Sequence, residues 1–279
     1  MKKSFKYHSA LTIAGFDGSG GAGIQADIKT FSALGCYATS VLTALPVQNT
    51  QGVRNIYPIP VSAVQEQIEA IMEDIFPDAI KIGMVHTPAL VECIVKTLKK
   101  YPRTPLVFDP VMVATSGHTL IEEDTIQAIT EQLFPLADLI TPNMDEAAIL
   151  AGMEISTPGH MYKAGEKILQ LGCNAVLLKG GHLRSPRITS LYFEKDRKAV
   201  SSYEFEKFDT NNTHGSGCTL SSAIAAFLAR GTGLEEAVAL GQDYTHEAIR
   251  ASADVLTGKG NGPLNHFYHP QKLIKYEMV

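Results

Sequence analysis

A short segment of the chain combines glycines with a cysteine at a predicted helix start. The segment Thr213-His-Gly-Ser-Gly-Cys-Thr219 precedes a run of small and apolar residues that predicts a helix. Glycine lets backbone N–H groups approach a ligand closely, and a helix N-terminus adds unpaired donors and a positive dipole end. These features favour an anion site, and the same field would lower the pKa of the Cys218 thiol. The alternative is a glycine-rich turn followed by a buried structural cysteine.

Four polar residues follow predicted strands. Asp109 and Lys179 each end an apolar segment, and Asn143 and Glu146 stand three apart at the start of a predicted helix. Carboxylates of this kind can hold Mg²⁺, usually through water, near nucleotide phosphates. Simpler interpretations exist: Asp109 as a turn acid, Asn143 and Glu146 as a capping box, and Lys179 as a surface residue. The last is weakened because apolar residues should bury the strand before Lys179.

The glycines near the N-terminus do not form a standard nucleotide loop. Gly18-x-Gly20-x-x-Gly23 matches the dinucleotide fingerprint, but residues 39–48 contain no Asp or Glu to hold a ribose. A Walker A loop is also excluded, because Gly21 follows Gly20 where that motif needs lysine. The glycines remain compatible with a ligand, and a nicotinamide-dependent oxidoreductase is disfavoured.

Composition bounds the class of protein. The chain has 279 residues, 45% of them hydrophobic, which suits one α/β domain spanning residues 1–279. The net charge of −5, without a long basic run, argues against nucleic-acid and membrane-surface partners. The four cysteines are widely spaced, as expected for reduced thiols in a cytoplasmic protein. No apolar stretch reaches the roughly 18 residues of a membrane span.

Strands and helices are predicted to alternate along the chain. Strands are expected at 10–14, 38–45, 79–83, 105–109, 137–141 and 175–179, and an antiparallel pair at 188–194 and 200–208. Helices are expected to end near 34 and to span 61–73, 88–99, 122–133, 144–151, 162–171, 220–227 and 234–256. Right-handed crossovers then give a doubly wound, mostly parallel sheet flanked by helices. Ligands bind at the carboxyl ends of such strands, which is where the following residues fall: Gly15, Gln48, Met84, Asp109, Asn143 and Lys179.

Several motifs occur in one order over nearly the whole chain. They include Ser19-Gly-Gly-Ala-Gly-Ile-Gln-Ala-Asp27, Gln48-Asn-Thr50, Lys81-Ile-Gly-Met84, Thr141-Pro-Asn143, Lys179-Gly-Gly-His182, the cysteine segment and Gly258-Lys-Gly-Asn-Gly-Pro263. Together they resemble the hydroxymethylpyrimidine/phosphomethylpyrimidine kinases of thiamine biosynthesis, within the ribokinase-like superfamily. Most of that superfamily has an aspartate base where this chain has Cys218, whereas the pyrimidine-kinase branch has cysteine.

The resemblance implies an ATP- and Mg²⁺-dependent kinase of ribokinase-like fold, and suggests a homodimer. It implies an anion hole and base formed by Gly215, Ser216, Gly217 and Cys218. The implied aminopyrimidine site consists of Gly15, Ala22, Asp27, Pro46, Gln48, Met84 and Val111. The residues implied for ATP are Thr213, Asp109, Asn143, Glu146 and Lys179, with Asp109 and Glu146 at the metal.

Other functions stay open on the sequence alone. A pyridoxal or pyridoxine kinase has the same fold, but Gln48 favours a pyrimidine edge, because an amide offers both an acceptor and donors. A catalytically inactive ligand sensor would not need the carboxylates, Lys179 and the cysteine segment. Other ribokinase-like sugar kinases carry little weight.

Overall fold

An eight-stranded sheet in the order β11-β10-β9-β8-β7-β6-β2-β3 forms the centre of the computed structural model, which describes residues 3–112, 121–181 and 186–278. The parallel strands are β2 (Ser9–Ala14), β3 (Tyr37–Leu42), β6 (Ala79–Ile82), β7 (Leu106–Phe108), β8 (Leu139–Ile140) and β9 (Ala175–Leu178). The antiparallel edge consists of β10 (Arg187–Glu194) and β11 (Ser201–Glu206). The predicted mostly parallel sheet with an antiparallel pair is confirmed.

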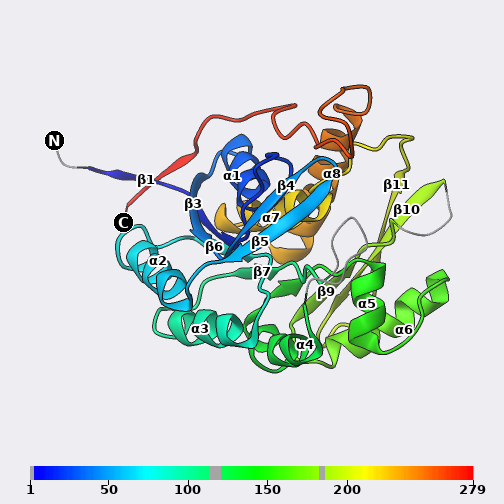
Figure 1. Ribbon diagram of the computed structural model, residues 1–279, viewed down its shortest axis with the longest axis horizontal. Helices are drawn as coiled ribbons and strands as arrows, with labels where there is room; N and C mark the ends of the chain where they lie inside the picture. The colour runs from blue at the N-terminus through cyan, green and yellow to red at the C-terminus, as the bar shows by residue number, and fades with distance from the viewer. Residues whose placement is uncertain (1–2, 113–120, 182–185, 279) are drawn as a thin grey trace.

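Helices cover both faces of the sheet (Figure 1). One face packs against α1 (Gly23–Ala33), α7 (Ser216–Ala229) and α8 (Leu234–Arg250). The other packs against α2 (Val61–Asp74), α3 (Pro88–Leu98), α4 (Glu123–Ala128), α5 (Met144–Ala151) and α6 (Pro158–Leu169). In the described part of the chain, no helix combines the length and apolar character needed to cross a membrane.

Strand β9 shows why the central strands have apolar residues at successive positions of the sequence. Ala175 and Leu177 are buried against the α1–α7–α8 side, and Val176 and Leu178 against the other side. Successive side chains of a strand point to opposite faces, so a sheet covered on both faces needs apolar residues at every position. The burial of β9 also fixes the position of Lys179, which follows it directly.

The strand predicted at 38–45 is wrong in its second half. Strand β3 ends at Leu42, and Thr43 leaves the sheet with its hydroxyl donating to the carbonyl of Met84. The chain then forms β4 (Ala44–Asn49), which pairs antiparallel with β5 (Gly52–Pro58) in a separate two-stranded hairpin. The apolar run contains two strands in different sheets, so hydrophobicity alone could not locate the break. A second short pair, β1 (Phe5–Tyr7) with β12 (Lys275–Glu277), was also not predicted.

Several predicted helices have different bounds in the structure, and the one expected at 220–227 spans Ser216–Ala229. The helix expected at 162–171 begins at Pro158, because Thr157 caps it by accepting the N–H of His160. The segment predicted as one helix at 122–133 changes from α4 to a π-helix, Ile129–Leu133. The helix expected to reach 256 ends at Arg250.

The packing of α6 on β10 generates a stability prediction. A Cβ added to Gly165 would lie 2.2 Å from the ring of Phe193, which is buried in the core. We expect Gly165→Ala to lower the free energy of unfolding by about 1–3 kcal/mol, as overpacked cores do. Gly159→Ala lies on the same helix, where the nearest atom to an added Cβ is Oγ1 of Thr157 at 3.9 Å, an ordinary contact, and should cost nothing measurable. Equal denaturant midpoints for the two variants would contradict this packing.

Candidate active site

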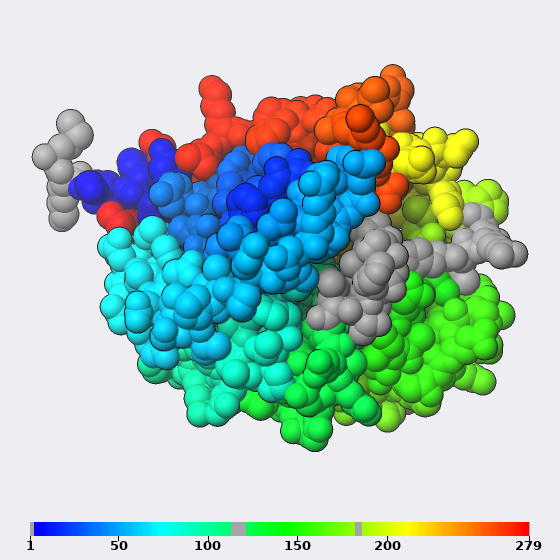
Figure 2. Space-filling view, viewed as in Figure 1, coloured from blue at the N-terminus to red at the C-terminus, as the bar shows by residue number. Residues whose placement is uncertain are grey.

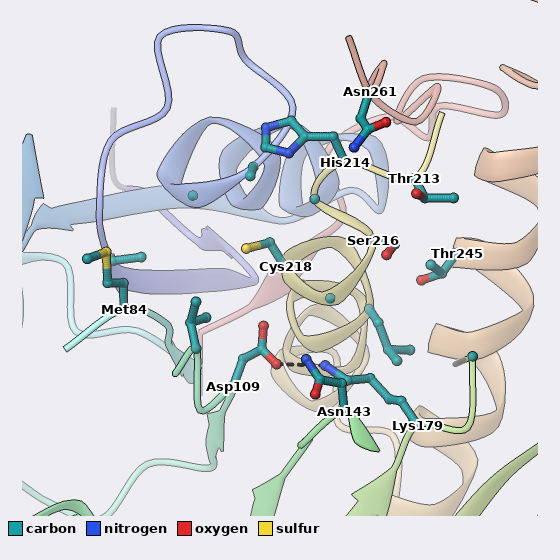
Figure 3. Close-up of a pocket in the computed structure, with 18 of the residues that line it drawn as sticks. Met84, Asp109, Asn143, Lys179, Thr213, His214, Ser216, Cys218, Thr245 and Asn261 are labelled. Carbon is teal, nitrogen blue, oxygen red and sulfur yellow. Dashed lines mark hydrogen bonds and ion pairs between the residues drawn. The ribbon is translucent and has the colours of Figure 1, made fainter. Parts of the chain in front are cut away.

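The carboxyl ends of the parallel strands open into a cleft of about 640 Å³. The β4–β5 hairpin, light blue in Figure 2, crosses this face of the molecule diagonally. Every residue predicted for the site lines this cleft except Asp27. Figure 3 places Met84 and Thr245 on opposite sides of Cys218, so the cleft has two ends that meet at the cysteine. His182, the last residue of the Lys179 motif, lies outside the described residues.

Two glycine loops meet at the centre of the cleft: the first glycine loop, residues 15–23, and the second glycine loop, residues 213–218. Gly215 precedes α7 with a φ of +81°, and a Cβ there would lie 1.8 Å from the carbonyl oxygen of Gly21. Only glycine permits this contact. Helix α7 begins at Ser216, whose N–H donates to the Thr213 carbonyl at 3.1 Å, and the next two N–H groups of the first turn, those of Gly217 and Cys218, have no intrahelical acceptor. Both residues line the cleft, so their N–H groups are available to an anion, and the anion site stays a prediction.

The Asp17 carboxylate joins the two glycine loops. It accepts the backbone N–H groups of Ser19, Gly21 and Ala22 at 2.9, 3.1 and 2.7 Å, and it lies 2.8 Å from Nε2 of His214. Burial would raise the pKa of Asp17, but side-chain hydrogen bonds from His214, Ser19 and Gln48 outweigh it and hold the pKa well below its usual range. Sequence reasoning missed Asp17. Its signal was an acid followed by glycines and a serine, which is a typical acceptor for loop N–H groups.

Asp109 and Lys179 form a partly buried ion pair beneath the second glycine loop. The Lys179 ammonium donates to Oδ1 of Asp109 at 3.0 Å (Figure 3), and the Thr141 hydroxyl donates to the same oxygen at 2.9 Å. Burial would raise the pKa of Asp109, but the Lys179 and Lys81 ammonium groups lower it. A Cβ on Gly217 would lie 3.2 Å from Nζ of Lys179. These contacts are incompatible with the alternatives of a surface lysine and an isolated turn acid.

Asn143 and Glu146 form a capping box at the start of α5. The Asn143 side chain accepts the Glu146 N–H at 2.9 Å, and the Glu146 carboxylate accepts the Asn143 N–H at 2.8 Å. Glu146 is nevertheless buried in the cleft wall, and burial with the nearby Asp109 charge raises its pKa to about 7 against the opposing Lys179 charge. The capping interpretation is confirmed, and it leaves the carboxylate facing a second acid.

The Asp109 and Glu146 carboxylates fit a magnesium ion only if other groups supply most of its ligands. Asp109 and Glu146 are oxygen donors whose like charges oppose each other, a repulsion that a dication would relieve. Among the residues that the structure describes, no three His, Cys, Asp or Glu side chains converge on a metal position. Mg²⁺ would therefore take most of its ligands from phosphate and water, as it commonly does.

Asp27 lies beneath the cleft rather than in it. Its carboxylate is fully buried, lies 2.9 Å from the Lys81 ammonium, and accepts the hydroxyls of Thr12 and Ser222 at 2.6 Å each. The prediction that Asp27 holds the substrate directly is wrong, because these donors and the surrounding helices leave no oxygen open to the cleft. Sequence reasoning gave no role to Lys81, although a lysine inside the apolar strand β6 signals a buried partner.

Cys218 faces the cleft, but the predicted lowering of its thiol pKa is wrong. Burial raises the pKa of Cys218 to about 11, and the Asp27 and Asp109 carboxylates add to that effect. The Lys81 ammonium and the N–H of Gly23 act in the opposite direction and do not overcome it. Cys218 therefore carries its proton at neutral pH. The helix-start argument considered one field and could not include the desolvation imposed by the surrounding chain.

The end of the cleft away from Lys179 is formed by the hairpin and the ends of β2 and β6. A β-bulge between Val47 and Gln48 shifts the register of β4 against β5, and Pro46 and Gln48 both line the cleft. Met84 packs next to Gly15, where a Cβ would lie 3.4 Å from its sulfur. Apolar Met84 and Val111 with the amide of Gln48 can enclose a flat ring and read one polar edge.

Comparison with known proteins places this chain in a family. A family model described as phosphomethylpyrimidine kinase matches residues 17–265. The chain belongs to this family. A hydroxymethylpyrimidine/phosphomethylpyrimidine kinase of Rhizobium meliloti (strain 1021) is 45% identical over 260 residues, which cover 93% of this chain and 97% of the relative.

Two solved structures resemble this chain, one of the same family and one with a different activity. A crystal structure of phosphomethylpyrimidine kinase from Clostridium difficile 630 has a TM-score of 0.76 and 45% identity, covering 86% of this chain and 99% of that one. An ADP complex of Bacillus subtilis pyridoxal kinase has a higher TM-score, 0.85, at 36% identity, covering 94% and 98% of the two chains. The ribokinase-like fold is thus common to both activities, and nucleotide use by such a neighbour agrees with a kinase that uses ATP.

The raised pKa of Cys218 predicts slow alkylation at neutral pH. Because the thiolate is the reacting species, the rate of modification by iodoacetamide should rise about tenfold per pH unit and show no plateau up to about pH 10. Peptide mass spectrometry can follow Cys218 separately from the other cysteines. A plateau near pH 7 would mean that the thiolate forms easily and that the helix-start field dominates after all.

Proposed function

We propose that this chain transfers the terminal phosphoryl group of ATP to 4-amino-5-hydroxymethyl-2-methylpyrimidine, and then to its monophosphate, in thiamine biosynthesis. The observation that carries the proposal is the position of Gln48. Its side chain belongs to the hairpin and lines the same cleft as Met84, Val111, Asp109, Lys179 and the second glycine loop. An amide that can recognise the ring and a loop that can bind phosphate thus line one cleft. This arrangement suits transfer of a phosphoryl group to a substituent of the ring.

The substrate end would recognise the ring by one polar edge and two faces. The carbonyl oxygen of the Gln48 amide can accept a hydrogen bond from the amino group, and its NH₂ can donate one to the neighbouring ring nitrogen. Met84 and Val111 would pack on the ring, and the backbone at Gly15, Ala22 and Pro46 would complete the wall. The hydroxymethyl group would then point towards Cys218, where the two glycine loops meet.

The phosphate end would neutralise and align charge. Lys179 would contact the transferred phosphoryl group, and the N–H groups at the start of α7 would hold its oxygens. Thr213 and Asn143 line the same end of the cleft and would hold the nucleotide. Bound Mg²⁺ would neutralise phosphate charge near Asp109 and Glu146. Phosphoryl transfer depends more on alignment than on covalent help, so fixed groups of this kind can supply most of the catalysis.

Cys218 would take the proton of the substrate hydroxyl. Only the small thiolate fraction can do so, because the pKa is about 11, but a thiolate of that pKa is a strong base. The Lys81 ammonium and the Gly23 N–H are placed to stabilise it. The alternative is that the second glycine loop acts through its backbone alone.

Pyridoxal phosphorylation is the second candidate, favoured by the overall similarity to pyridoxal kinase. The decisive test measures ATP consumption and product mass with hydroxymethylpyrimidine, its monophosphate and pyridoxal, side by side. We expect both pyrimidines to be phosphorylated with higher kcat/KM than pyridoxal. Activity on pyridoxal with none on either pyrimidine would overturn the proposal.

We also propose a cytoplasmic homodimer. Leu45, Val47 and Tyr57 expose apolar side chains along the hairpin, which a second copy could cover. All four cysteines are free thiols, as a reducing compartment allows. Sedimentation at micromolar concentration tests the dimer.

Replacing Gln48 tests the substrate end. Gln48→Met keeps a side chain of similar size but removes the amide, leaving the amino group and ring nitrogen unpaired. We expect a loss of roughly 1–3 kcal/mol in kcat/KM for the pyrimidine, with the KM for ATP nearly unchanged. Unchanged kinetics with the pyrimidine would remove Gln48 from the site.

Replacing Glu146 separates its two roles. Gln at this position can still complete a capping box, so Glu146→Gln should leave the thermal midpoint almost unchanged. Loss of the negative charge should lower kcat and raise the Mg²⁺ concentration needed for half-maximal rate. Steady-state rates over a Mg²⁺ titration provide the measurement. A wild-type Mg²⁺ dependence would mean that Glu146 caps the helix and has no role at the metal.

A further inference from the structure

The glycine-rich segment at residues 258–263, here called the clasp, holds the tip of the β4–β5 hairpin. The backbone N–H groups of Lys259 and Gly260 each donate to the hydroxyl of Thr50 at 3.2 Å, and that of Asn261 donates to the Thr50 carbonyl at 3.0 Å. Thr50 lies at the turn of the hairpin, two residues after Gln48. In Figure 1 the hairpin tip reaches towards the orange segment that follows α8.

Steric constraints make the contact specific for glycine. A Cβ on Gly260 would lie 2.0 Å from the Thr50 carbonyl oxygen, a backbone atom that cannot move without the hairpin. Gly258 has a φ of +75°, and its Cβ would lie 2.4 Å from Oγ1 of Thr50. Side chains at these positions would push the hairpin tip away from the clasp.

The other end of the clasp is attached to the second glycine loop. The N–H of His214 donates to the Gly262 carbonyl at 3.1 Å, and His214 forms an isolated β-bridge with Pro263. A Cβ on Gly21 would lie 2.9 Å from Cβ of Pro263, so the clasp also contacts the first glycine loop. Six residues thus connect the hairpin tip to both loops at the reacting centre.

The hairpin needs such support because, within the described residues, its two strands pair only with each other. It forms a two-stranded sheet apart from the central sheet. Isolated two-stranded hairpins are marginally stable in water. Yet β4 carries Gln48 on a bulge, and the whole turn, residues 49–53, lines the cleft.

We propose that the clasp sets the affinity for the substrate ring by fixing the hairpin, and with it Gln48, at a constant distance from the second glycine loop. Thr50 and Gly260 are then positioning residues that act through Gln48. The inference rests on the proposed function for its substrate, whereas the clasp itself acts on the hairpin whatever ring is bound.

The experiment compares Gly260→Ala and Thr50→Val with wild type. Gly260 does not line the cleft, so its substitution cannot remove a direct substrate contact. We expect Gly260→Ala to raise the KM for the pyrimidine at least tenfold and the KM for ATP less than twofold. Thr50→Val removes two hydrogen bonds and should raise the pyrimidine KM about threefold to tenfold. Thr50→Ser keeps the hydroxyl and should restore the wild-type value.

Two controls separate positioning from general damage. Gly233→Ala has open space around it, lies outside the cleft and should change neither KM. In a Gln48→Met background, Gly260→Ala should raise the pyrimidine KM by much less than it does alone, because the group being positioned is gone. Equal increases in both KM values, or the same increase in the Gln48→Met background, would overturn the inference.

Limited proteolysis tests the clasp without any substrate. Arg54 lies exposed on β5, so trypsin can report opening of the hairpin. Gly260→Ala and Thr50→Val should speed cleavage after Arg54, and Thr50→Ser and Gly233→Ala should not. Unchanged cleavage in the first two variants would overturn the inference. A wild-type enzyme inactive on both pyrimidines, with faster cleavage in those variants, would instead count against the proposed substrate.

Discussion

The site depends on the backbone contact between Gly21 and Gly215. Phosphoryl transfer requires the acceptor hydroxyl and the phosphoryl group to approach within roughly 3–3.5 Å. Both glycine loops line the cleft. In the proposed function the first borders the substrate and the second borders the phosphate, so their separation would set this approach. A Cβ on Gly215 would overlap the carbonyl of Gly21. Asp17 holds the loops at this separation by binding N–H groups of one and the His214 ring of the other.

Two ion pairs lie beneath the contact between the two glycine loops. Asp27–Lys81 connects α1 to β6, and Asp109–Lys179 connects the ends of β7 and β9. Burying charges costs free energy, and ion pairs of this kind seldom stabilise a fold more than apolar residues would. Fixed charges in a site of low dielectric constant can, however, stabilise charge that develops during a reaction without reorganising. We infer that the two pairs serve alignment and charge at the reacting centre more than stability.

The strand and helix pattern was largely predictable because it follows from local periodicity. Buried strands such as β9 and the positions of Asp109, Asn143 and Lys179 after them needed only the rule that parallel strands end at one edge. Asp27 was misplaced because the family resemblance gave a residue but not the direction in which α1 turns its side chain. Asp17, Lys81 and the pKa of Cys218 depend on partners from distant segments. The hairpin was missed because one apolar run enters two sheets, and the overall fold could not separate pyrimidine from pyridoxal kinases.

In the proposed function, the meeting point of the two glycine loops supplies both the phosphate-binding N–H groups and the proton acceptor. Single-turnover and steady-state kinetics of Cys218→Ala test it most directly, because this change removes sulfur and keeps the backbone N–H and the helix. A positioned proton acceptor contributes roughly 10²–10⁴-fold. We expect kcat to fall more than about tenfold, with the KM for ATP nearly unchanged. Turnover close to the wild-type rate would contradict it and leave the second glycine loop acting through its backbone alone.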